Sequence, residues 1–130
     1  MKVQSLAFHF LSAAAGILVG GSALAAELVM FEDPGCPYCR RWHAEVGISY
    51  HATEEGRMAP LRRVDIKDRS KAGISLESPV TYTPTFVLAE NGREVGRIVG
   101  YPGADFFYSF LANLLDEHAS SRSRATGLSR

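Results

Sequence analysis

The sequence predicts an α/β fold: a compact, four-stranded mixed sheet with helices on both faces. Two continuous apolar runs, Leu28–Phe31 and Thr85–Leu88, are typical of strands buried on both faces. A helical pattern and a further strand follow the first run, which implies a parallel pair of strands with a right-handed crossover. The dipeptide Asn91-Gly92 then predicts a tight hairpin that adds an antiparallel edge.

The first helix is expected to begin at the CPYC segment, residues 36–39, and to end near Ala52. Four side chains in it recur at steps of three and four residues and therefore share a face: Cys39, Trp42, Val46 and Tyr50. Gly47 weakens this helix relative to alanine, but it allows close packing against a neighbour.

Residues 61–66 are predicted to form the second strand, with Val64 and Ile66 on one face. The segment 67–82 is mixed in character, and we expect a short helix within it without defined ends. The hairpin is predicted to return through a strand at residues 94–99.

An amphipathic helix over residues 103–119 is expected to close the domain. Apolar pairs repeat in it at helical spacing and predict a stripe facing the core rather than a cofactor: Phe106/Phe107, Phe110/Leu111 and Leu114/Leu115. Residues 120–130 are polar and lack periodicity, so they are predicted to form a disordered tail. The folded domain is therefore assigned to residues 26–119.

Residues 1–25 have the features of a signal peptide. Lys2 gives a positive start, an apolar stretch runs from Leu6 to Val19, and Ala23-Leu24-Ala25 fits the small-x-small rule of signal peptidase. The stretch is short for a spanning helix, which needs about 20 residues. An uncleaved membrane anchor is therefore the less favoured alternative, and we expect export to the periplasm with cleavage after Ala25.

The charge balance gives no reason to expect a nucleic acid or an anionic membrane surface as partner. The chain carries 14 basic and 14 acidic residues, and loss of Lys2 with the signal peptide leaves a formal net charge of −1. The remaining chain is long enough to bury one core without a metal or a structural disulfide.

The two cysteines, Cys36 and Cys39, are only three positions apart. A disulfide between them closes a very small loop and stabilises the fold little, so chemistry explains the pair better. Between a buried strand and a helix start, Cys36 faces unpaired N–H groups and the positive end of the helix dipole, which favour a thiolate. Pro37 suits the first helical position, and Arg40 and Arg41 add positive charge.

Cys39 lies one turn further along the helix, among apolar neighbours, and is expected to be more buried and less acidic than Cys36. Cys36 is therefore predicted to be the attacking sulfur and Cys39 the resolving one.

A zinc site is the rival interpretation of the cysteine pair, with His43 and His51 as further ligands. A structural zinc site usually takes its second pair of ligands from another segment, and His51 lies roughly 12 Å from His43 along a helix. We expect both histidines to be exposed. His118 is placed near the C-terminus of the last helix, where its charge is favourable.

Pro84 stands directly before an apolar strand, which places it at the first residue or the edge of that strand. Together, CPYC after LVMFEDPG, then TPTFVL and NGREVGRIVGYPG, resemble the thioredoxin superfamily over about residues 27–119. CPYC itself is typical of glutaredoxins. With its signal peptide, the chain is also similar to the small periplasmic thioredoxin-like proteins of bacterial sulfur-oxidation systems.

The resemblance implies a cis Thr83–Pro84 bond beside the cysteine pair, with both residues in the substrate-binding surface and with Pro37 and Tyr38 orienting the motif. The sequence also departs from ordinary thioredoxins. No Trp precedes Cys36, and the strand at 28–31 lacks the buried acid that accepts a proton there. The proton acceptor for Cys39 stays open among water, Glu32 and Asp33. No glutathione-binding set is evident, so glutaredoxin activity does not follow.

We therefore predict a thiol–disulfide oxidoreductase that reduces disulfides or mixed disulfides on partner proteins. The redox-active pair Cys36–Cys39 requires no organic cofactor or metal, and a membrane thiol-reducing system would regenerate it in an oxidising compartment. The domain has no inserted helical unit and no dimerisation module, which favours a monomeric reductase over an oxidase or isomerase of the same fold. From a different class, the alternative is a metal-binding or metal-delivery protein that uses the same pair.

Overall fold

The computed structural model describes residues 26–127 and confirms the predicted α/β fold. Its strands are β1 (Glu27–Glu32), β2 (Leu61–Asp65), β3 (Thr85–Glu90) and β4 (Arg93–Val99), in the sheet order β2-β1-β3-β4. β1 pairs in parallel with β2 and antiparallel with β3, and β3 and β4 form the antiparallel hairpin. The signal peptide predicted for residues 1–25 lies outside the described residues.

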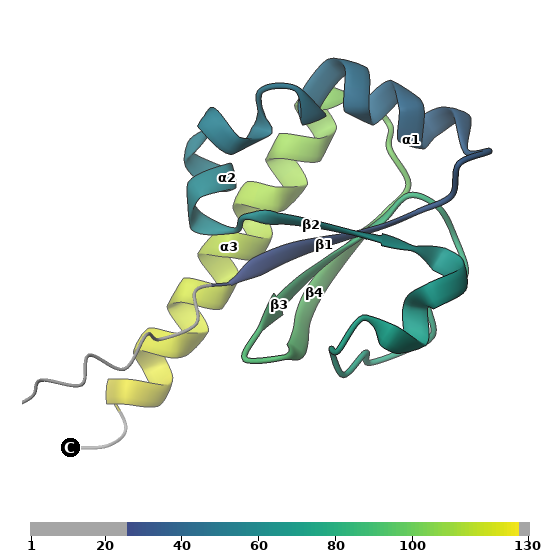
Figure 1. Ribbon diagram of the computed structural model, residues 1–130. Helices are drawn as coiled ribbons and strands as arrows, with labels where there is room; N and C mark the ends of the chain where they lie inside the picture. Colours follow the sequence, from purple (N-terminus) through teal and green to yellow (C-terminus); the bar gives the residue numbers. More distant parts are fainter. Residues whose placement is uncertain (1–25, 128–130) are drawn as a thin grey trace, which may run out of the picture.

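The two faces of the sheet are covered by different elements (Figure 1). The helices α1 (Pro37–Trp42), α2 (Glu54–Met58) and α3 (Ala104–Gly127) lie on one side, and the 3-10 helix η3 (Ile66–Lys71) lies on the other. Alternate residues of β1 reach the two cores, Leu28 and Met30 on the helical side and Val29 and Phe31 on the opposite side. The prediction that this strand is buried on both faces is confirmed.

The helix predicted over residues 36–52 is broken into shorter pieces. α1 passes into a π-helical turn, η1 (His43–Gly47), and a 3-10 turn, η2 (Tyr50–Ala52), precedes α2. Its predicted inner face is confirmed, because Cys39, Trp42, Val46 and Tyr50 are all buried. A Cβ at Gly47 would lie only 3.0 Å from the Trp42 ring, so the glycine does permit close packing. Thr53 then caps a new helix by accepting a hydrogen bond from the Gly56 N–H at 3.0 Å.

The apolar stripe predicted for the last helix is only half correct. Phe107, Leu111 and Leu115 are buried, but Phe106 and Phe110 are 60% and 47% exposed. Adjacent residues of an α-helix point about 100° apart, so one member of each of the first two apolar pairs points away from the sheet. Phe106 and Phe110 are exposed on the outer side of α3, whereas Leu114 is partly buried and packs against the core.

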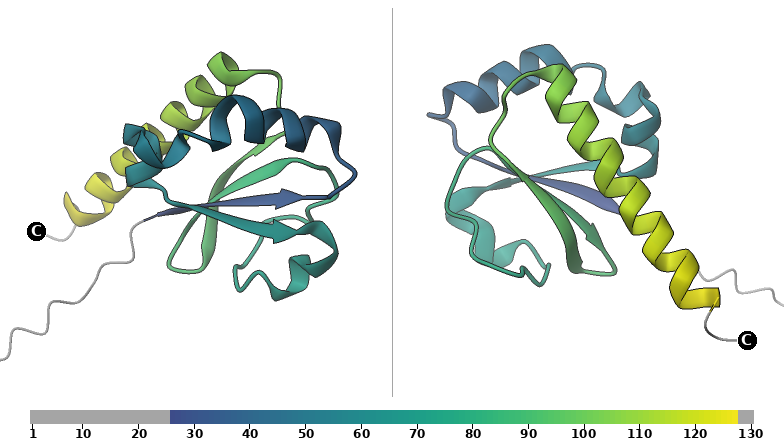
Figure 2. Two further views of the ribbon diagram at one scale, coloured as in Figure 1. Left: turned by 45° about the horizontal axis from the view of Figure 1, so that its top comes forward. Right: turned by 180° about the vertical axis from the view of Figure 1, so that it is seen from behind.

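The prediction of a disordered tail from residue 120 is wrong for the part that the structure describes. α3 continues to Gly127, and Figure 2 shows its last turns extending past the sheet. Glu90, at the end of β3, forms ion pairs with His118 and with Arg122, the latter at 3.2 Å. His118 is therefore held against the sheet rather than lying at the end of its helix. No helix among residues 26–127 is long and apolar enough to cross a membrane.

The β3–β4 turn forms as its sequence predicts. Asn91 and Gly92 both have positive φ, 51° and 72°, which is the backbone geometry that a two-residue hairpin turn requires. The turn aligns Glu90 with Arg93 and sets the register of β4 against β3.

Candidate active site

The loop after β1 delivers Cys36 to the start of α1. The Asp33 carboxylate accepts a hydrogen bond from the Gly35 N–H at 2.8 Å, and the Cys36 N–H donates to the Asp33 carbonyl at 3.0 Å. Cys36 is the N-cap of α1, with Pro37 as the first helical residue, as predicted. The local sequence thus turns the chain sharply and places a sulfur atom where a capping oxygen usually lies.

The cysteine pair is joined as a disulfide, with its Cα atoms 5.3 Å apart. Cys36 is 7% exposed and Cys39 2% exposed, so the predicted difference in burial has the expected sign. The Cys36 sulfur accepts a hydrogen bond from the Cys39 N–H at 3.1 Å. When the disulfide opens, the same N–H can stabilise a Cys36 thiolate, because hydrogen bonds to the charged form favour it.

The Thr83–Pro84 peptide bond is cis, as the resemblance implied. Thr83 and Cys36 line the same surface cavity, and Thr83 and Pro84 share a neighbouring groove of about 290 Å³ with Tyr38. Tyr82, which is 63% exposed, also lines this groove. Four of the residues proposed from the sequence therefore meet at one surface, while Pro37 is the exposed first residue of α1, between Cys36 and Tyr38.

The far wall of this groove is held by a contact that the sequence did not reveal. The Tyr101 hydroxyl donates a hydrogen bond to the Glu45 carboxylate at 2.6 Å, and the Arg41 guanidinium donates to the same carboxylate at 2.8 Å. Burial and the hydrogen bond to Glu45 raise the pKa of Tyr101, so the phenol stays a donor. Arg41 was expected to add charge near Cys36, but its charge is paired with Glu45 and lies over the Tyr101 ring instead.

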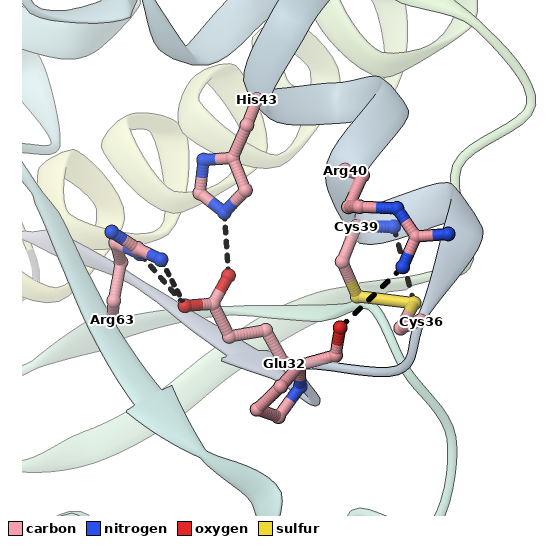
Figure 3. A network of polar contacts seen from close by, with 7 residues as sticks. Glu32, Cys36, Cys39, Arg40, His43 and Arg63 are labelled. Carbon is pink, nitrogen blue, oxygen red and sulfur yellow. Dashed lines mark hydrogen bonds and ion pairs between the residues drawn. A yellow bond between two sulfur atoms is a disulfide. The ribbon is translucent and has the colours of Figure 1, made fainter.

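A second cavity, of about 230 Å³, lies on the inner side of the disulfide, where Cys39 forms part of its wall. The Glu32 carboxylate stands there between two partners, as Figure 3 shows: His43 Nε2 at 2.5 Å and the Arg63 guanidinium, whose Nε lies at 2.7 Å. His43 was expected to be merely exposed, but it is about two-thirds buried and hydrogen-bonded across to β1.

Arg63 was not predicted as a site residue, and His43 was considered only as a ligand in the rival zinc interpretation, although a signal for Arg63 exists. β1 and β2 are parallel, and Met30 lies opposite Arg63. Since strand side chains alternate, Glu32 shares the face of Met30 and therefore of Arg63. His43 follows Cys39 by four residues and so lies one turn further along the same side of the helix. No sequence pattern pointed to Tyr101.

The zinc interpretation required a group of ligands around the cysteine pair. Within residues 26–127, no three His, Cys, Asp or Glu side chains are grouped so that they could hold a metal ion. His51 is exposed, and the imidazole of His43 is hydrogen-bonded to Glu32.

Comparisons with known proteins agree with this geometry. The family model of the thioredoxin-like domain matches residues 26–115. No curated protein sequence matches the chain. The structure resembles the reduced form of the periplasmic thioredoxin SoxS from Paracoccus pantotrophus, with 49% identity and a TM-score of 0.69 over 72% of this chain and 98% of that one.

A thioredoxin from Malassezia sympodialis, the allergen Mala s 13, is 15% identical, with a TM-score of 0.50 over 72% of this chain and 80% of that one. That likeness shows the fold alone. The family match covers most of the chain, and the structure places a CxxC pair at the helix start where thiol–disulfide chemistry needs it. The chain therefore belongs to the thioredoxin-like family and is a thiol–disulfide oxidoreductase.

Proposed function

We propose that this protein works in the periplasm and reduces disulfides or mixed disulfides on partner proteins. The observation that best supports this proposal is the position of Cys36. Its sulfur accepts the Cys39 N–H at a helix start and lines the same cavity as Thr83. Cys39 is buried directly behind it. The Cys36 sulfur is thus the one that meets a partner, and the Cys39 sulfur is shielded until the resolving step.

The reaction needs two exchanges and no organic cofactor or metal. The Cys36 thiolate attacks one sulfur of a partner disulfide, forms a mixed disulfide and releases the other partner sulfur as a thiolate. Cys39 then loses its proton and attacks the Cys36 sulfur, which releases the second partner sulfur. Two electrons move from the dithiol to the partner, and the protein is left with its Cys36–Cys39 disulfide.

The groove beside the pair fits a protein segment as substrate. It is open, about 290 Å³ in volume, and lined by exposed apolar and aromatic side chains together with backbone. The exposed members are Tyr38, Tyr82 and Val99. Exposed aromatic residues around a shallow groove are typical of surfaces that bind polypeptides.

The likeness to a periplasmic thioredoxin supports the proposed compartment, together with the signal peptide expected at residues 1–25. In an oxidising compartment the disulfide form accumulates, so a membrane thiol-reducing system has to return electrons to the pair. We place the protein among the thioredoxins that serve bacterial sulfur oxidation, acting as a monomer. Between β2 and β3 the described chain has only the short helix η3, without the larger helical insertion expected of an oxidase.

Trapping of partners tests the proposal. A Cys39→Ser variant, expressed with its own leader, should accumulate mixed disulfides because its nucleophile has no resolving partner. Cys36→Ser is the matched control and should trap few partners, since Cys39 is buried. Equal trapping by both variants would contradict the assignment of roles. Tight, stoichiometric zinc or copper in the reduced wild type that is lost in Cys36→Ser would instead support the metal-binding alternative.

A further inference from the structure

The resolving step requires a group that accepts the proton of Cys39, and the N–H groups at the start of α1 cannot accept a proton. Cys39 is 2% exposed, and it must lose its proton before it can attack. A free thiol has a pKa of about 8.5, so near neutral pH only a few per cent is thiolate. The β1 strand beneath it is apolar from Leu28 to Phe31, and all four side chains are buried. The side chains that could accept its proton are therefore those that line the cavity of which Cys39 forms part of the wall.

The charged groups that line this cavity together with Cys39 come from several elements: Glu32 from β1, Asp33 from the loop, Arg40 from α1, His43 from η1, and Arg63 and Asp65 from β2. Two of the three carboxylates accept hydrogen bonds from nearby backbone N–H groups in exposed contacts. Asp33 accepts from the Gly35 N–H, and Asp65 caps η3 by accepting from the Lys67 N–H, each at 2.8 Å.

Glu32 differs from both, because its side chain is only 16% exposed and its carboxylate is hydrogen-bonded to the His43 imidazole, while one acceptor site stays free. An ionised carboxylate has about four sites for accepting hydrogen bonds. Arg63 occupies two of them on Oε1, at 2.7 Å from Nε and 2.6 Å from the terminal nitrogen, and His43 occupies one on Oε2. One site on Oε2 is left. Figure 3 shows this carboxylate and the disulfide on two sides of the same space.

We propose that the Glu32 carboxylate, paired with His43, accepts the proton of Cys39 during the resolving step. This inference rests on the proposed function. The proton leaves Cys39 Sγ, crosses the cavity through water and arrives at Glu32 Oε2. A volume of about 230 Å³ has room for several water molecules at about 30 Å³ each. The Cys39 thiolate then attacks the Cys36 sulfur, and the partner thiolate leaves.

The other two residues have distinct roles in this step. Arg63 is a positioning residue, because it holds Oε1 from the neighbouring parallel strand and keeps Oε2 turned to His43. His43 Nε2 stays hydrogen-bonded to the Glu32 carboxylate when that carboxylate takes up the proton. No buried polar group of this pair is therefore left without a hydrogen-bond partner. When the disulfide is reduced again, the same pair returns the proton to Cys39.

A Glu32→Gln variant tests the proposal in the full exported protein. Glu27→Gln is the matched control, because Glu27 pairs with Arg62 across the same two strands at the opposite end of β1. The reduced protein is mixed with the aromatic disulfide dithiobis(nitrobenzoate) in a stopped-flow instrument. Attack by Cys36 releases one coloured thiolate, and resolution by Cys39 releases a second, so the two steps are measured separately.

General-base assistance is typically worth about 10²–10⁴-fold, and we expect Glu32→Gln to slow the second release at least about tenfold near neutral pH. The deficit should narrow as the pH rises above about 8.5, the pKa of a free thiol, because a growing share of Cys39 then ionises without a base. The first release, and both releases in Glu27→Gln, should match wild type. An unchanged second release, or a deficit that is the same at every pH, would overturn the proposal. Absence of the first release in wild type would instead contradict the proposed function.

Discussion

A buried ion pair in β4 fixes the segment that leads to the cis proline, and Glu94→Gln should expose its contribution to stability. Glu94 is 3% exposed and accepts hydrogen bonds from Arg97 at 2.5 and 2.7 Å. It also accepts from the Glu77 N–H at 2.8 Å, while Arg97 donates to the Ser78 carbonyl at 2.8 Å. The pair therefore ties residues 77–78 to the edge strand.

The expected loss follows from what glutamine keeps and what it removes. Glutamine keeps the shape and can still accept from the Glu77 N–H, but it removes the charge that faces Arg97. Hydrogen bonds to charged groups contribute about 1.5–3 kcal/mol, and we expect a loss in that range. A fully buried pair would lose about 3–5 kcal/mol, but the Arg97 side chain is 19% exposed and keeps some hydration.

Urea unfolding of the oxidised protein at neutral pH measures this difference. Glu27→Gln is again the control, because its pair with Arg62 has the same chemistry but is more than one-third exposed on both sides. Exposed pairs contribute about 0.2–1 kcal/mol, so the control should lose clearly less. Equal losses in the two variants would refute the argument from burial.

The pH dependence gives an independent check. Burial alone would raise the pKa of Glu94, but hydrogen bonds from Arg97 and the Glu77 N–H lower it overall. A carboxyl whose pKa is lowered by folding stabilises the protein above its unfolded pKa, which is about 4.3 for Glu. That contribution is lost as the pH falls through the folded pKa. The gap between wild type and Glu94→Gln should therefore narrow in acid, and a constant gap would show that charge is not responsible.

Two further predictions concern the leader and the groove. Protein recovered from the periplasm should begin at Ala26 by intact mass, whereas a membrane-retained chain that begins at Met1 would contradict cleavage. Tyr82→Ser should lower kcat/KM for a protein disulfide about 5- to 30-fold, or about 1–2 kcal/mol, as for an aromatic interface residue, and leave a small aromatic disulfide unaffected. Ile48→Ser, at an exposed apolar residue that lines none of the cavities beside the disulfide, is the control.

Local signals explain why most of the fold could be predicted. The β1 and β3 strands are short apolar runs, and the β3–β4 turn depends on two adjacent residues that tolerate positive φ. The same kind of reasoning failed where tertiary contacts decide the outcome. Glu90 holds the end of α3 through His118 and Arg122, and neither contact can be read from a polar segment without periodicity.

The residues of the candidate site also fall into two groups, those that a short motif predicts and those that only tertiary contacts bring together. Cys36, Cys39 and Pro84 stand in short motifs, so the sequence could place them. The contact of Tyr101 with Glu45 joins residues 56 positions apart, and no periodicity encodes it. The cavity on the inner side of the disulfide depends on the register of β1 against β2, which pairs Glu32 with Asp65 and Met30 with Arg63.

Ordinary thioredoxins carry a buried, proton-accepting acid in the strand that corresponds to β1, and this chain lacks one there. The register of β1 against β2 shows how Glu32 could take over that role. Met30 and Glu32 point to the same face of β1, two residues apart, and only Met30 is fully buried. An acid at the position of Met30 would lie within the apolar core, where its charged form is costly. At Glu32 the carboxylate stays on the face that carries Cys39, but at the strand end, where a cavity, an imidazole and a guanidinium surround it. Proton exchange through water can then replace direct contact with a buried acid, and the strand keeps its continuous apolar core.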